Sequence, residues 1–172
     1  IHQRPDAPSM VRQGVTTLVV GNCGFAPFPV AVSDRAELAR WMAFLSADEA
    51  LLFPSAAGTR SARETLPLVP NVVQLAGHGT LRWATMGASS RAPTPDQQGR
   101  MGSLLAEALE EGAVGLSSGL IYDPGAHAQT SELLALARVL AEHGGWYATH
   151  VRGEGESLLE AIGEAIAIGR EA

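Results

Sequence analysis

The sequence predicts an α/β fold with a parallel sheet. Segments typical of strands and segments typical of helices alternate four times along the 172 residues. The turns that lead from a helix into the next strand are short, at residues 111–112 and 143–145, whereas the loops that lead from a strand into the next helix are long and polar. In α/β barrels and open α/β sheets, loops of the second kind carry the functional sites.

The first part of the chain contains the weaker signals. A short helix is expected over residues 6–13, and the β-branched, apolar run VTTLVVG predicts a strand over residues 15–21. Ser33 is a suitable N-cap for an amphipathic helix over residues 33–45. Residues 46–67 show few periodic features, so a loop with at most a helical turn is expected there.

Stronger signals follow in the rest of the chain. Thr94 and Pro95 mark the N-cap and the first residue of a long helix, which Gly112 ends. The other elements alternate in the same way: a strand over residues 71–77, a strand over residues 113–119, a helix over residues 130–143 capped by Thr130, a strand over residues 146–151 and a final helix that begins near Gly155 or Ser157.

Composition argues against several kinds of partner. The formal net charge is −6 at pH 7 and the sequence has no basic cluster, so no nucleic acid partner is expected. The longest apolar runs, such as residues 15–21, are shorter than the ~20 residues of a membrane-spanning helix, and no signal peptide opens the chain, so no membrane partner is expected. A single cysteine cannot form an internal disulfide, which favours a cytoplasmic location.

Cys23 and His150 are the main candidates for a functional site. Cys23, the only cysteine, lies two residues beyond the first predicted strand, where a thiol can be a metal ligand, a nucleophile or an inert buried filler. His150 ends the last predicted strand, where an imidazole can bind a metal, act as a general base or brace a neighbouring loop. Because both residues follow strand ends, a parallel fold would bring them to one rim.

Other candidates share this position at or just past the predicted strand ends: His78, Ser117, Ser118 and Tyr122. His78 lies between two glycines in GHGTLR, where either an active-site role or a loop-bracing role fits. Competing motifs are poor. SSGLIY lacks the G-x-S-x-G spacing of a nucleophile elbow, and GNCGFAP has too few glycines for a dinucleotide loop.

Four segments carry a family resemblance: QGVTTLVVGNCGFAP, NVVQLAGHGTLR, EEGAVGLSSGLIYDPGA and GGWYATHVRGEGESLLEAIGEAIAIGREA. In this order they resemble the N-acyl-D-amino-acid deacylases (D-aminoacylases) of the amidohydrolase superfamily, over nearly the whole chain apart from residues 46–67. The resemblance implies a metal-dependent (β/α)8 barrel that uses Zn²⁺ to hydrolyse the amide bond of N-acyl-D-amino acids. It further implies that Cys23 and His150 are zinc ligands and that Tyr122 faces the substrate, with His78 and Ser118 shaping the substrate-binding rim.

Part of the family's site has no counterpart here. The family begins its barrel with an H-x-H pair, which residues 1–5 do not contain, and its further histidine ligand and its aspartate general base are also missing. We therefore expect residues 1–172 to form a fragment of a metal-dependent amidohydrolase barrel domain. The expected fold is a partial (β/α)8 TIM barrel of roughly the second to fifth strand–helix units, inactive by itself, with its catalytic base outside this chain.

Two alternatives stay open. One is another hydrolase of the same superfamily, dihydroorotase-like or hydantoinase-like, in which a carbamylated lysine bridges the metals. All 12 basic residues of this chain are arginines, which counts against that alternative. The other is a non-catalytic partial barrel that associates with itself through unpaired strands.

Overall fold

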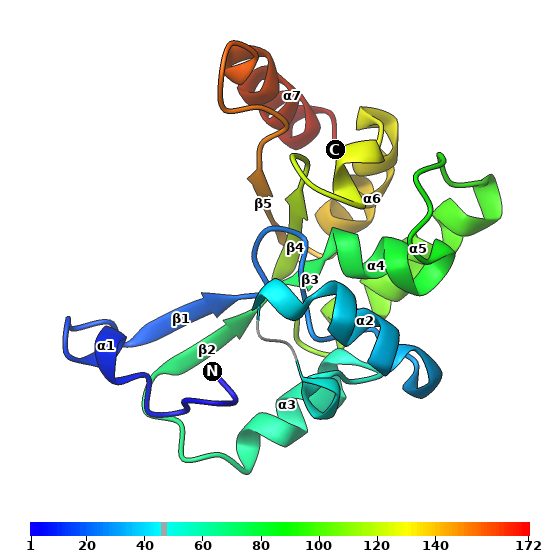
Figure 1. Ribbon diagram of the computed structural model, residues 1–172. Helices are drawn as coiled ribbons and strands as arrows, with labels where there is room; N and C mark the ends of the chain where they lie inside the picture. Colours follow the sequence, from blue (N-terminus) through cyan, green and yellow to red (C-terminus); the bar gives the residue numbers. More distant parts are fainter. Residues whose placement is uncertain (46–47) are drawn as a thin grey trace.

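The structure, a computed structural model, describes residues 1–45 and 48–172 (Figure 1). Its strands are β1 (Thr17–Val20), β2 (Asn71–Gln74), β3 (Ala76–Gly77), β4 (Gly115–Gly119) and β5 (Trp146–His150). The pairs β1–β2, β3–β4 and β4–β5 are all parallel. The predicted α/β fold with parallel strands in sequence order is therefore confirmed.

The strand predicted over residues 71–77 is divided at Leu75. Its first part, β2, pairs with β1, and its second part, β3, pairs with β4. The backbone N–H of Leu75 donates to the carbonyl of Val20 at 2.9 Å, and that of Val114 donates to the carbonyl of Gln74 at 2.9 Å. These bonds join the two small sheets where β1 and β2 turn away from β4 and β5 (Figure 1). The result is a partial, barrel-like arrangement.

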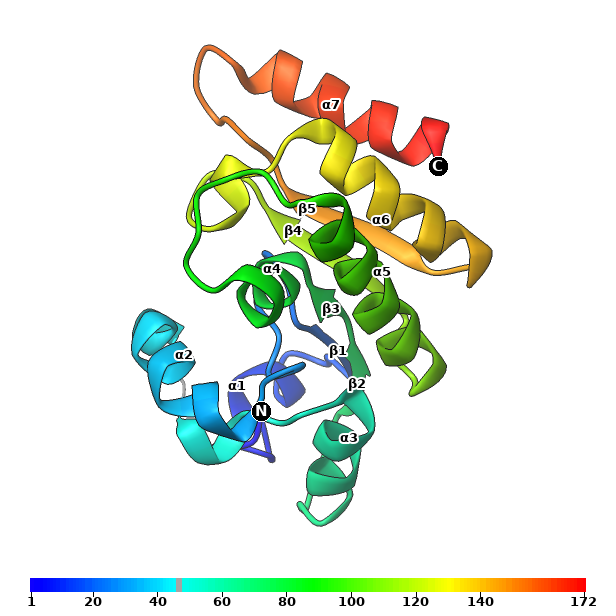
Figure 2. The same cartoon turned by 90° about the vertical axis from the view of Figure 1, so that its right-hand side faces the viewer.

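Helices alternate with these strands: α1 (Pro8–Val11), α2 (Arg35–Trp41), α3 (Ala56–Glu64), α4 (His78–Met86), α5 (Pro95–Glu110), α6 (Thr130–Glu142) and α7 (Leu158–Glu171). Helices α5, α6 and α7 lie side by side next to the strands (Figure 2). Leu105 of α5, Leu136 of α6 and Leu116 of β4 are fully buried in the main core. Among the described residues, no helix has the length and apolar character of a membrane span.

Local sequence explains the best-defined helix boundary. The Thr94 hydroxyl accepts from the Gln97 backbone N–H at 3.3 Å, and the Gln97 side chain accepts from the Thr94 N–H at 2.9 Å. This capping box satisfies two backbone donors that a helix N-terminus would otherwise leave free. The predicted start of α5 at Pro95 is thereby confirmed, and Gly112, with φ +106°, follows the end of the helix as predicted.

Two predictions of loop structure are wrong. The expected loop over residues 46–67 contains the nine-residue helix α3, although residues 46 and 47 lie outside the described part of the chain. Ser55 caps α3 by accepting from the Gly58 N–H at 3.1 Å. Helix α4 begins at His78, directly after β3, where the sequence predicts a loop. No side chain caps the N-terminus of α4, so the sequence before it contains no residue that marks the start of a helix.

Two predicted caps are also wrong. The Ser33 hydroxyl donates to the Asp34 carboxylate at 2.6 Å, and the region predicted as one helix over residues 33–45 is α2 flanked by 3₁₀ turns. The Thr130 hydroxyl donates to the Glu164 carboxylate of α7 at 2.8 Å, while Gln129 occupies the N-cap position of α6. In both cases the N-cap position falls on a neighbouring residue, Asp34 for α2 and Gln129 for α6.

Candidate metal centre

The loop GNCG after β1 has an unusual backbone. Gly21, Cys23 and Gly24 adopt positive φ angles of 84°, 58° and 80°. A Cβ atom on Gly21 would lie 2.3 Å from the backbone oxygen of Leu75, so a larger residue does not fit there. Cys23 has a Cβ atom, and the left-handed conformation costs such a residue about 1–2 kcal/mol. Strain of this kind clusters at functional sites.

Buried side chains hold this loop in place. The Ser117 hydroxyl of β4 accepts from the Gly24 N–H at 2.9 Å and donates to the Gly21 carbonyl. The backbone N–H of Thr80 in α4 donates to the Gly24 carbonyl at 3.2 Å. Ser117 and Thr80 have no exposed surface. The backbone that carries the Cys23 thiol is therefore fixed on both sides of Cys23.

Cys23 and His150 line the same pocket, which has a volume of about 350 Å³. The other lining residues come from the Cys23 loop, from β5 and from the loop after β5: Asn22, Ala148, Thr149, Val151 and Glu154. The pocket lies at the carboxyl ends of the strands, as the sequence predicts for the functional rim. The structure thus brings the two predicted zinc ligands together, and their ligand roles stay a prediction.

Tyr122 connects these two residues. Its hydroxyl donates to the Cys23 carbonyl at 3.3 Å and lies 3.3 Å from Nδ1 of His150. The other ring nitrogen of His150, Nε2, donates to the Glu154 carboxylate at 3.0 Å. Burial, the hydrogen bond and charge of Cys23 and the charge of Glu154 raise the pKa of Tyr122. The phenol therefore stays protonated at neutral pH and can act as a hydrogen-bond donor beside the pocket.

His78 and Ser118 lie at the same end of the strands but are fully buried. Nε2 of His78 donates to the Glu132 carboxylate at 2.8 Å. The Ser118 hydroxyl lies 2.8 Å from both the Tyr147 hydroxyl and the Thr149 hydroxyl. In this conformation both side chains brace the rim, and their predicted contact with substrate is untested.

The sequence does not single out Glu132, although it is the centre of a buried network. Its second carboxylate oxygen accepts from Nη1 of Arg82 at 2.6 Å, and Arg82 also donates to the carbonyls of Ser89 and Arg91 at 3.2 and 3.0 Å. The side chains of Arg82 and Glu132 are 0% and 2% exposed. The sequence gives one signal of this network: Glu132 lies beside the apolar Leu133 in the first turn of a helix.

Arg152 is a second residue whose role the sequence does not reveal. It makes two hydrogen bonds of 2.9 Å to the Glu164 carboxylate. It also donates to the carbonyls of Ala126 and Ala128 at 3.1 and 2.8 Å. Arg152 therefore ties the loop after His150 to the segment that follows Tyr122.

The donors in the pocket fit part of a zinc site. A thiolate and a neutral imidazole are common zinc ligands, and catalytic zinc normally has three protein ligands. Within residues 1–45 and 48–172, no group of three or more His, Cys, Asp or Glu side chains gathers where it could hold a metal ion. Cys23 and His150 can therefore supply two of the ligands that such a site needs, and a metal on His150 would replace its contact with Tyr122 or Glu154.

Comparison with known proteins gives close relatives, although no family model matches the chain. The chain is 38% identical over 169 residues to the D-aminoacylase of Alcaligenes xylosoxydans xylosoxydans. It is 40% identical over 171 residues to the N-acyl-D-glutamate deacylase of the same organism. Each alignment covers 98% of this chain and 34% of the relative, so the chain spans about a third of the length of these curated relatives.

A solved structure shows the same likeness in three dimensions. The N-acyl-D-glutamate deacylase from Bordetella bronchiseptica, complexed with zinc and a phosphonate inhibitor, superposes with a TM-score of 0.86 at 40% identity. The superposition covers 98% of this chain and 35% of that chain.

Proposed function

We propose that Cys23 and His150 hold part of a zinc site. The chain belongs to the N-acyl-D-amino-acid deacylase family, and the intact enzyme would use this site to hydrolyse the amide bond of N-acyl-D-amino acids. The observation that carries this proposal is the shared pocket. A thiol from the loop after β1 and an imidazole from the end of β5 line one hollow at the carboxyl ends of the strands.

Four residues in or beside the pocket have distinct tasks in this proposal. Cys23 as thiolate and His150 as neutral imidazole would hold the metal, which would supply Lewis-acid polarisation of the scissile carbonyl and a more acidic water. Glu154 orients the His150 ring through Nε2, as carboxylates commonly do for ligating histidines. Tyr122, kept protonated, can donate a hydrogen bond to an oxygen of the substrate beside the metal. The proton-transferring base lies elsewhere in the intact enzyme.

Metal binding is the direct test of the site. Replacing Cys23 with alanine should abolish the thiolate-to-metal charge-transfer absorption of the Co²⁺-loaded protein, because that absorption requires a sulfur ligand. Replacing His150 with alanine should keep the absorption but weaken Zn²⁺ affinity at least about tenfold, since loss of even an outer-shell partner typically costs 10–100-fold. Absorption spectroscopy and competition with a chromophoric chelator measure the two effects.

The matched control is His143→Ala. His143 lies at the end of α6, with Nδ1 2.8 Å from the carbonyl of Val139, and it does not line the pocket. Its replacement should change neither the absorption nor the affinity. A charge-transfer band that survives in Cys23→Ala would contradict the metal role of Cys23. Loss of acetate release from N-acetyl-D-amino acids when the intact protein is treated with a chelator tests the reaction itself.

We also propose that the chain by itself associates with a second copy through α7 and β5. Leu159, Ile162 and Ile166 of α7 are 81%, 40% and 49% exposed. Their spacing of three and four residues places them on one helix face. Trp146 of β5 is 60% exposed, and among the described strands β5 pairs with β4 alone. An apolar helix face beside an unpaired strand edge favours association.

The double variant Leu159→Glu/Ile166→Glu should therefore shift the chain toward a monomer. Size-exclusion chromatography with light scattering measures the mass of each species. Val32→Glu is the control, because Val32 is 72% exposed but lies outside α7 and β5. A wild-type chain that stays monomeric at every concentration would contradict this proposal.

A further inference from the structure

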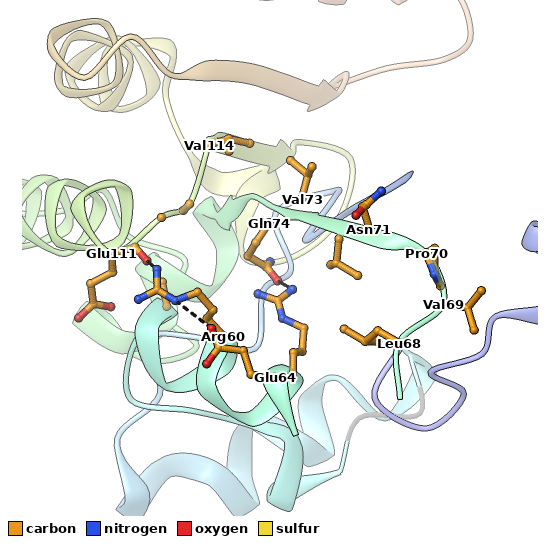
Figure 3. Close-up of a pocket in the computed structure, with 15 residues that line it drawn as sticks. Arg60, Glu64, Leu68, Val69, Pro70, Asn71, Val73, Gln74, Glu111 and Val114 are labelled. Carbon is orange, nitrogen blue, oxygen red and sulfur yellow. Dashed lines mark hydrogen bonds and ion pairs between the residues drawn. The ribbon is translucent and has the colours of Figure 1, made fainter. Parts of the chain in front are cut away.

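A second pocket lies at the opposite end of the strands from Cys23 and His150. It has a volume of about 420 Å³, within the range of small-molecule sites. Helix α3 forms one side, β2 forms another, and the segments leading into β2 and β4 close the amino end (Figure 3). The pocket extends along β2 from its first residue, Asn71, to its last, Gln74.

Most charged groups around this pocket have partners. Nη1 of Arg60 donates to the Glu111 carbonyl at 2.8 Å, and Nε of Arg60 lies 3.9 Å from the Glu64 carboxylate (Figure 3). The Glu111 carboxylate accepts from the Ala57 backbone N–H at 2.9 Å, at the N-terminus of α3. The two carboxylates of the lining are therefore engaged within the protein.

Arg63 is different, because it is buried without a carboxylate. The residue is 8% exposed, and its guanidinium donates to a neutral acceptor, Oε1 of Gln74, at 2.9 Å. Gln74, which points from β2 toward α3 in Figure 3, is itself fixed by donating to the Leu75 carbonyl at 2.8 Å. Within the described residues, no Asp or Glu side chain forms an ion pair with Arg63.

The pKa values of Arg63 and of its neighbour His2 are consistent with an unpaired positive charge. Burial lowers the pKa of Arg63, although an arginine still remains protonated at neutral pH. Burial and then the charge of Arg63 lower the pKa of the nearby His2. A buried charge is unfavourable unless it is paired, so the site favours a negative group beside Arg63.

We propose that this pocket binds a small oxyanion, the carboxylate or phosphate group of a small molecule, on the guanidinium of Arg63. The planar guanidinium offers a fork of N–H donors that matches the oxygens of either group. Arg60, three residues earlier on α3, also lines the pocket, but it lies beside the Glu64 carboxylate, so Arg63 is the lining cation that has no carboxylate partner among the described residues. This pocket and the pocket of Cys23 and His150 share no lining residue.

Isothermal titration calorimetry of the purified protein with acetate, phosphate and sulfate, at constant ionic strength set with chloride, tests the proposal. The wild type should bind at least one of these anions saturably. Arg63→Gln should weaken that binding at least about tenfold, because charge-assisted hydrogen bonds are lost. Saturation by acetate alone assigns the site to carboxylates, and saturation by phosphate or sulfate assigns it to phosphate groups.

Two further variants keep the test decisive. Arg12→Gln removes an exposed arginine outside the pocket and should leave binding unchanged. Arg63→Lys keeps the charge but removes the fork, so it should bind with intermediate affinity, and it replaces Arg63→Gln if circular dichroism shows that the glutamine variant does not fold. Absence of saturable binding to the wild type, or equal binding by the wild type and the Arg63 variant, would overturn the proposal.

Discussion

Replacing Glu132 with glutamine is expected to lower the free energy of unfolding by about 3–5 kcal/mol, the usual cost of breaking a buried ion pair by removing one partner. The reason is the Arg82 guanidinium, which has no exposed surface and lies 2.6 Å from Glu132. Glutamine has nearly the same shape as glutamate, so packing is kept while the Arg82 charge stays buried and unpaired. Because folded domains are stable by only about 5–15 kcal/mol, this single change approaches the limit of stability.

Urea unfolding followed by circular dichroism measures this loss. Glu142→Gln on the same helix is the matched control, since Glu142 is exposed and should change stability by less than about 0.5 kcal/mol. The double variant Glu132→Gln/Arg82→Met removes both charges and should be less destabilised than the sum of the single variants. A Glu132→Gln variant within about 1 kcal/mol of the wild type would show that the network contributes little.

The same network predicts how stability depends on pH. Burial raises the pKa of Glu132, but the hydrogen bonds and charges of His78 and Arg82 outweigh burial and hold that pKa below its usual value. A carboxyl with a lowered folded pKa stabilises the fold above its unfolded pKa of about 4.3, and this stability is lost as the pH falls through the folded pKa. The unfolding free energy of Glu132→Gln should therefore fall less than that of the wild type below pH ~4.3.

Much of the fold could be predicted because the signals are local. The β-branched run of β1, the capping box of α5 and the glycine after it need no knowledge of distant contacts. Helix α3 escapes prediction because its sequence AAGTRSARE presents alanines and buries Thr59 and Arg63 in place of large apolar residues. Helix α4 escapes because it starts without a cap where a strand and a glycine-flanked histidine suggest a loop.

The candidate site also has a part that the sequence predicts and a part that it does not. The approach of Cys23 to His150 follows from the rule that parallel strands carry functional residues at their carboxyl ends. The buried roles of His78 and Glu132 do not follow, because these residues come from the start of α4 and the first turn of α6 and meet across 54 positions of sequence. The uncompensated charge of Arg63 is equally invisible, since its partner Gln74 belongs to a strand whose register no local pattern determines.

The 172-residue chain by itself should hydrolyse no N-acetyl-D-amino acid, even when loaded with zinc. Its pocket offers Cys23 and His150 as metal ligands, and among the described lining residues Glu154 is the sole carboxylate. In the proposed site Glu154 positions the His150 ring, and no second carboxylate of the described lining remains to take the proton of an attacking water. A site with two protein ligands binds zinc weakly compared with the three that catalytic zinc normally has.

Loss of the positioned base alone would lower the rate by about 10²–10⁴. Acetate release from N-acetyl-D-amino acids measures turnover, with N-acetyl-L-amino acids as the stereochemical control and the related D-aminoacylase, which is about three times as long as this chain, as the positive control. The intact enzyme should hydrolyse the D-substrates and lose that activity in Cys23→Ala. Turnover by the isolated chain would contradict this prediction if it disappears in Cys23→Ala. Such a result would show that the activity depends on this pocket and not on a contaminating hydrolase, and that two metal ligands and Glu154 suffice for hydrolysis.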